Sequence, residues 1–263
     1  MRNEVLHGYL IHHRKYRERS HIVHLFTQEY GRMDGSLRQT PPPQYQPISL
    51  QATGKSELKN FTKLEIVNQP IFFFGDAFFS GFYLNEVLLR LCPLEVEMPQ
   101  TFAKYAETLT ALQQLSEQSN PNLYLKQILR QFEHILLEEL GYGLDFSLDA
   151  HQVQIDPLQH YYFQLNAGFM PSAKALRSTM SGQQILSMLD HENGGDFNPE
   201  QLQLLTKLYR QVITALLGDR PLKSRQLWIQ NIISPIRTRS SSSSRAAIPS
   251  PCGTPSPRTA SCR

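Results

Sequence analysis

A short run of basic residues around one tyrosine has the most suggestive chemistry in this sequence. Five of the six residues from 14 to 19 are basic or aromatic, and Glu18 is the single acidic one. Cations follow phosphates, and an aromatic ring offers a base a stacking surface worth about 1–3 kcal/mol. The pattern indicates a site for single-stranded nucleic acid; the alternative is a solvated hairpin loop whose charges keep it in water. The candidate contacts in this run are Arg14, Lys15, Tyr16, Arg17 and Arg19.

The distribution of charge along the chain supports a basic face near the N-terminus. Positions 1–65 carry 10 Lys+Arg against 6 Asp+Glu, positions 66–220 carry 9 against 17, and positions 221–263 carry 7 against 0. Such asymmetry points to a polyanionic partner for the basic part and a different task for the acidic middle. The further candidate phosphate contacts are Arg32, Arg38, Lys55 and Lys59.

The sequence motifs give little support for nucleotide hydrolysis or for nucleophilic catalysis. Gly54-Lys55-Ser56 resembles the end of a phosphate-binding P-loop, but Ser49 stands where the first glycine belongs, and a strand-like segment follows. The patterns GxSxG and GxGxxG are both missing. The sequence therefore predicts a protein that is not an enzyme and needs no cofactor.

Metal binding is also disfavoured. Five histidines lie within the first 24 residues, yet on a strand His21 and His24 face opposite sides, and no nearby cysteine completes a ligand set. The three cysteines of the chain have no CxxC spacing, so neither a disulfide framework nor a thiolate zinc site is expected. With no apolar run long enough to span a bilayer, we expect a soluble cytoplasmic protein that has no membrane partner.

The elements that would position the basic run are strands. Apolar and β-branched residues on both sides of it predict a β-ribbon from Gly8 to Arg32 with a cationic connection. Two further strands are expected at Tyr45–Gln51 and Phe61–Asn68, separated by a turn. Four or five short strands in under seventy residues indicate a small closed or nearly closed barrel.

Helical periodicity begins after Phe72. We expect helices over Ala77–Leu91, Thr101–Glu117 and a third stretch that Asn120 caps and Gly141 ends. Residues 143–166 are irregular, with two apolar pieces, 144–148 and 161–165, that form a small hairpin or pack as loop. Two more helices follow, a short one from about position 181 to 189 and a long one that starts near Asn198 and stops at Gly218.

The predicted class is α+β: an N-terminal barrel over residues 1–75, then an α-helical domain over residues 76–233. From position 234 onward serine, proline and arginine dominate, and no acidic residue occurs. Such a composition cannot bury a core, so a disordered basic tail is expected over 234–263.

Four segments together resemble the bacterial RecO family of recombination mediators and DNA-repair proteins. They are GYLIHHRKYRERSHIVHLFTQEYGR from Gly8, SGFYLNEVLLRLCP from Ser80, LRQFEHILLEELGYGLDF from Leu129 and LLGDRPLKSRQL from Leu216. Their order and spacing cover nearly all of residues 1–227, and LGYGLDF and RPLKSR are the most telling pieces.

The resemblance implies an OB-fold barrel followed by a helical domain. It also implies binding of single- and double-stranded DNA and annealing of complementary strands without ATP hydrolysis. The implied partners are RecR, the acidic C-terminal tail of single-strand-binding protein, and the RecA recombinase that such proteins help to load in the RecF pathway of homologous recombination.

The chain departs from the family in two respects. Some members carry a four-cysteine zinc site, whereas residues 143–175 contain no cysteine here, so no zinc is expected. Many members have an arginine-rich loop after the second strand, where this chain has MDGSLRQTPPPQ.

A second hypothesis assigns the main work to the helical domain. In that reading the protein is an adaptor whose helix faces, near Lys126, Arg130 or Lys174, receive a partner's acidic tail, and contact with DNA is secondary.

Overall fold

The computed structural model describes residues 2–69, 71–176, 178–189 and 196–230 of the 263-residue chain. The chain divides into two compact units, residues 1–225 and 226–263, and every element named below lies in the first. The basic tail expected over 234–263 lies outside the described residues.

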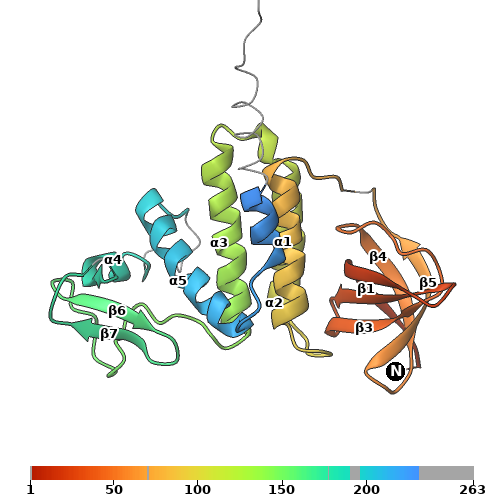
Figure 1. Cartoon of the computed structure of the whole chain (residues 1–263), viewed down its shortest axis with the longest axis horizontal. Coiled ribbons are helices and arrows are strands. Elements are labelled where there is room, and N and C mark those ends of the chain that lie inside the picture. The colour runs from red at the N-terminus through yellow and green to blue at the C-terminus, as the bar shows by residue number, and fades with distance from the viewer. Residues whose placement is uncertain (1, 70, 177, 190–195, 231–263) are drawn as a thin grey trace, which may run out of the picture. The chain divides into compact units, whose positions relative to one another are not determined.

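Five strands form a closed barrel in the first part of the chain (Figure 1). Their order around the barrel is β1-β2-β3-β5-β4, and the β3–β5 pair is parallel while the others are antiparallel. This is the topology of an OB fold, so the predicted barrel is confirmed. The strands are β1 (Arg2–Tyr16), β2 (Ser20–Thr27), β3 (Gly31–Leu37), β4 (Pro47–Thr53) and β5 (Leu58–Ile66).

Every second side chain along the strands points inward, and these side chains fill the inside of the barrel. β3 alternates strictly between buried and half-buried residues, as expected of a strand with one face on a core. Gly35 fits against the ring of Phe61, which lies 2.3 Å from where a Cβ would stand. The core consists of Leu6, Leu10, Val23, Leu25, Met33, Leu37, Ile48, Leu50, Ala52 and Phe61.

The first two strands are longer than the sequence suggested. β1 continues through Tyr16, which is the Cα partner of Ser20, so Arg14 and Lys15 lie on the strand rather than in a loop. The backbone ladder makes this possible because its hydrogen bonds do not depend on side-chain type. The cationic connection is therefore a short turn over residues 17–19, in which Arg17 has a φ of 56°.

Helices follow the barrel as predicted, and their ends match the expected signals. Asn120 accepts a hydrogen bond from the backbone N–H of Leu123 and so caps the third helix, while Gly141 follows its end with a φ of 80°. The second helix ends earlier than expected, and a 3₁₀ turn, Leu115–Glu117, follows it. These helices are α1 (Asp76–Leu91), α2 (Pro99–Gln113) and α3 (Pro121–Glu139).

The irregular region contains a small hairpin. β6 (His160–Gln164) pairs with β7 (Gly168–Ser172) and with the two-residue β8 (Met180–Ser181). The apolar piece 144–148 expected as a possible hairpin arm is not part of it. The last two helices are α4 (Gly182–Leu186) and α5 (Pro199–Leu217), each opened by a capping box.

An aromatic cluster joins the barrel to α2. The ring of Tyr9 in β1 lies 5.2 Å from that of Tyr105, and the ring of Phe26 in β2 lies 6.0 Å from it, both in edge-on geometry. Phe102 packs against Tyr9 at 5.8 Å and against Phe26 at 5.7 Å. Edge-to-face pairs of this kind add about 0.5–1.5 kcal/mol each beyond the area that they bury.

Replacing Phe26 by alanine should lower the free energy of unfolding by about 3–5 kcal/mol, because it empties a fully buried site at this cluster. Urea unfolding followed by circular dichroism measures the change. The matched control is Phe74→Ala, since Phe74 is 83% exposed and its loss should change the unfolding free energy little. Equal effects of the two substitutions would contradict the role given to the cluster.

Candidate nucleic-acid interface

The β1–β2 ribbon extends past the strand that covers its other side. β4 pairs with β1 only between Arg2 and Tyr9, so within the described residues Leu10 to Tyr16 are paired along one edge alone, by β2. The side chain of Gln44 donates a hydrogen bond to the carbonyl oxygen of Ile11 on the free edge. The end of the ribbon is thus accessible while its base is fixed in the barrel.

Cations and one aromatic ring occupy the end of the ribbon. Arg14, Lys15, Arg17 and Arg19 are all exposed, and Tyr16 retains 41% of its accessible surface. The guanidinium carbon of Arg17 lies 5.1 Å from the centre of the Tyr16 ring, within cation–π range. The five residues that the sequence singled out are therefore brought together on one accessible element.

Strand register places two other candidate cations at different ends of the barrel. Leu37 is the Cα partner of His21, so Arg38 follows β3 on the side where the ribbon turns. Thr53 is the partner of Arg2, so Lys55, in the turn after β4, lies near the opposite end of β1. Lys55 and Arg38 are both exposed, but of these two only Arg38 extends the cationic surface of the ribbon end.

Lys59 is not an exposed cation, contrary to the expectation from sequence. Its side chain is only 5% exposed, and its ammonium lies 2.7 Å from a carboxylate oxygen of Glu95. It also donates to the carbonyl oxygen of Ser56 at 2.7 Å. Lys59 is a partnered cation that ties β5 to the segment after α1, and it is not carried into the interface.

Arg32 likewise has a structural role. Its guanidinium donates to the carbonyl oxygens of Leu89, at 2.8 Å, and Cys92, at 3.3 Å, at the C-terminal end of α1. It also pairs with Asp34 at 3.1 Å. Burial opposes ionisation of Asp34, but hydrogen bonds from His24 and Arg32 leave the pKa of Asp34 below its ordinary value. A cation at this end of a helix is favoured by unpaired carbonyls and the helix dipole.

The helical part covers much of the barrel surface that OB folds use for nucleic acid. That surface is the outer face of strands 2 and 3 together with the loops that follow strands 1 and 4. Here Phe26 points outward from β2 onto Phe102 and Tyr105, and Arg32 points outward from β3 onto α1. The ribbon end, which includes the loop after strand 1, stays accessible.

The segment 220–225 carries cations that were not among the DNA contacts predicted from sequence. Arg90 donates to the carbonyl oxygens of Leu217 and Arg220, and Glu86 accepts from the backbone N–H groups of Lys223, at 2.9 Å, and Ser224, at 2.8 Å. The side chain of Lys223 remains exposed, and its charge acts on His12 of β1. RPLKSR was noted in the sequence, but its nearness to β1 depends on long-range contacts with α1.

A buried carboxylate organises the helical part. Glu133 of α3 is 1% exposed, accepts a hydrogen bond from the Tyr83 hydroxyl, and pairs with Arg130 at 2.6 Å. Burial raises its pKa, and the two partners oppose that effect. Arg225 lies over the Tyr83 ring at 5.8 Å. Arg130 is therefore engaged internally, whereas Lys126 and Lys174 are exposed.

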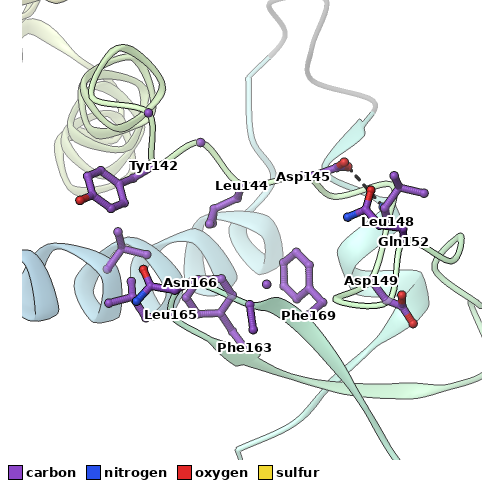
Figure 2. Close-up of a pocket in the computed structure, with 15 residues that line it drawn as sticks. Tyr142, Leu144, Asp145, Leu148, Asp149, Gln152, Phe163, Leu165, Asn166 and Phe169 are labelled. Carbon is purple, nitrogen blue, oxygen red and sulfur yellow. Dashed lines mark hydrogen bonds between the residues drawn. The ribbon is translucent and has the colours of Figure 1, made fainter.

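A cavity of about 390 Å³ lies beside the LGYGLDF segment, and Figure 2 shows Phe163 and Phe169 among the residues that line it. The carboxylate of Asp145 accepts from the backbone of Ser147 and Leu148, and that of Asp149 accepts from His151 and Val153. These aspartates hold turns, as such residues commonly do.

Over the described ranges, no group of three or more His, Cys, Asp or Glu side chains could hold a metal ion. Nor does that part of the chain contain a helix of the length and apolar character needed to cross a bilayer.

Comparison with known proteins identifies the class to which this barrel-and-helix chain belongs: DNA-repair proteins of homologous recombination. The sequence models named Recombination protein O N terminal and Recombination protein O C terminal match residues 1–70 and 75–226. DNA repair protein RecO of Pseudomonas paraeruginosa is 36% identical over 233 residues, covering 86% of this chain and 95% of the relative.

DNA repair protein RecO of Tolumonas auensis is 33% identical over 232 residues, covering 84% of this chain and 93% of the relative. That of Cellvibrio japonicus is 36% identical over 244 residues, covering 87% and 98%. The chain therefore belongs to the RecO family, which confirms the resemblance seen in the sequence. The family is one of repair mediators rather than a known enzyme family.

Replacing Arg32 by alanine should lower the free energy of unfolding by about 1–3 kcal/mol, because Asp34 and the last carbonyl groups of α1 lose their donor. Its effect on DNA affinity should be small. The comparison is Arg38→Ala, at an exposed position, which should leave stability unchanged within about 0.5 kcal/mol. Denaturant unfolding and oligonucleotide titration of both variants separate the two roles; a stable Arg32→Ala protein that has lost DNA binding would contradict this assignment.

Proposed function

We propose that the end of the β1–β2 ribbon is a sequence-independent DNA-binding element, and that through it this protein binds single- and double-stranded DNA and anneals complementary strands. The observation that carries the proposal is the accessible ribbon end, with four exposed cations around an exposed tyrosine. Arg38 and, on the facing segment, Lys223 extend the same surface, and Lys55 offers a separate contact after β4.

The physical basis of annealing is neutralisation of phosphate charge. Two complementary strands repel each other, and cations that follow both backbones lower this repulsion and release condensed counterions. Contacts to phosphate carry no sequence information, so the protein need not read base edges to bring complements together. The tyrosine stacks on any base, because every base has a π face. No step of this process requires ATP hydrolysis.

In the cell, we propose that the protein acts in the RecF pathway in the bacterial cytoplasm, at the nucleoid during repair. It binds RecR and the C-terminal tail of single-strand-binding protein, and helps to load RecA on single strands covered by that protein. What supports these proposals is membership of the RecO family. We propose the division expected from sequence: a DNA-binding barrel over 1–75, a helical domain over 76–233 and a basic tail over 234–263.

Replacing Arg14, Lys15, Arg17 and Arg19 together by alanine should weaken binding of a single-stranded oligonucleotide and make its affinity less dependent on salt. Each lost phosphate contact should reduce the slope of log K against log salt concentration by about 0.7. Fluorescence anisotropy across a salt series measures both quantities. All four positions are exposed, so the variant should keep its unfolding free energy.

The matched control removes exposed charge from the helical part. The triple substitution Lys126→Ala, Lys174→Ala and Arg210→Ala changes solvent-facing positions far from the ribbon in sequence. It should leave the salt slope unchanged. Unaltered binding by the ribbon variant would refute the site. Capture of an acidic single-strand-binding-protein tail peptide by a protein that does not bind DNA at all would favour the adaptor function.

A further inference from the structure

Four histidines lie in two cross-strand pairs on the ribbon that carries the proposed DNA contacts. The imidazole rings of His12 and His24 are 5.6 Å apart, and those of His13 and His21 are 6.0 Å apart. Their faces are set by a β-bulge between Leu10 and His12, which shifts the register of β1 against β2. Leu10 is opposite Leu25 in the barrel core, whereas His12, beyond the bulge, is opposite His24 on the outer face.

The outer pair lies in a row of charged groups that crosses the barrel. Asp34 of β3 is the Cα partner of His24, and its carboxylate lies 2.8 Å from the His24 imidazole. His24 thus has an anionic partner already. His12 is exposed, and the charged groups that act on it are positive: Arg14 on its own strand and Lys223 from the segment beside α1.

The second pair faces the other side of the ribbon. His13 is exposed, and His21 is half-buried and is the Cα partner of Lys15. These two imidazoles therefore lie beside a lysine of the proposed interface. Among the described residues, no carboxylate is paired with His12, His13 or His21.

The environment of His12 and His13 disfavours their charged forms in the free protein. Partial burial lowers the pKa of His12, and the charges of His24, His13, Arg14 and Lys223 lower it further. Burial and the charge of His21 lower the pKa of His13. A phosphodiester brought beside either ring reverses the electrostatic part, since an opposite charge within about 4–6 Å favours the charged form of a group.

We propose that His12 and His13 are additional phosphate contacts that take up protons when DNA binds, so that the affinity for DNA rises as the pH falls. The inference rests on the proposed DNA-binding function of the ribbon. His24 is excluded because its imidazole already lies 2.8 Å from the carboxylate of Asp34. The ligand class is the phosphodiester backbone, in single or double strands.

The direction of the pH dependence follows from the two protonation states. Bound phosphate gives the imidazoles of His12 and His13 a higher pKa in the complex than in the free protein, so binding takes up protons. The added affinity is fully present below the free-protein pKa and is lost as the pH rises through the pKa of the complex. Each unit of difference in pKa corresponds to a tenfold change in affinity.

The experiment measures binding of a thymine-only oligonucleotide, whose bases do not titrate in the range used, at pH 8 and pH 6. Affinity should be about tenfold higher at pH 6. The slope of log K against log salt should be steeper at pH 6 by about 0.7 for each added phosphate contact. Calorimetry in two buffers of different ionisation enthalpy should show net proton uptake by the full-length protein near neutral pH.

The variant His12→Asn, His13→Asn should lose the gain in affinity between pH 8 and pH 6. The control His7→Asn changes a histidine of the same strand that is paired with Glu29, 2.8 Å away, and it should keep the gain. Binding of the oligonucleotide with no proton uptake near neutral pH would overturn this inference alone. Absence of binding at every pH would instead overturn the proposed function. Proton uptake is measured on the unmodified protein, so this test does not depend on the folding of the variant.

Discussion

The packing of Tyr9 and Phe26 against Phe102 and Tyr105 is the interaction on which the rest of the structure depends. It joins the first two barrel strands to α2 and buries their outer face at the base of the ribbon. A two-stranded ribbon is only marginally stable by itself in water. Because its base is anchored in aromatic packing, the ribbon can carry exposed cations at its other end without losing its register.

The same anchoring decides which part of an OB fold remains available for binding. With Phe26 and Arg32 engaged by helices, the middle of the usual binding face is occupied, and the accessible surface moves to the turn after β1. Glu86 and Arg90 of α1 fix the segment that carries Lys223, and this brings a further positive charge close to His12. The helical part thus shapes the proposed interface while contributing little of its surface.

The sequence predicted much of this fold because local signals were strong. Apolar and β-branched residues indicated the barrel strands, and Asn120 located the start of α3. The ribbon cations were found for the same reason, since they are neighbours in sequence. Lys59 was misjudged because its neutralising partner, Glu95, lies 36 positions away and the two meet only in the fold. The histidine pairs were missed because the bulge after Leu10, which sets their faces, has no clear sequence signal.

The proposed function requires the ribbon end to bring complementary strands together by neutralising their phosphates. Annealing of two complementary fluorescent oligonucleotides, in buffer without nucleotide or metal and over a series of salt concentrations, tests this most directly. The protein should accelerate annealing at low salt, the acceleration should fade as salt rises, and the variant lacking the four ribbon cations should lose most of it. Annealing that is equally fast with that variant, or strands that stay apart while the folded protein is present, would contradict the claim.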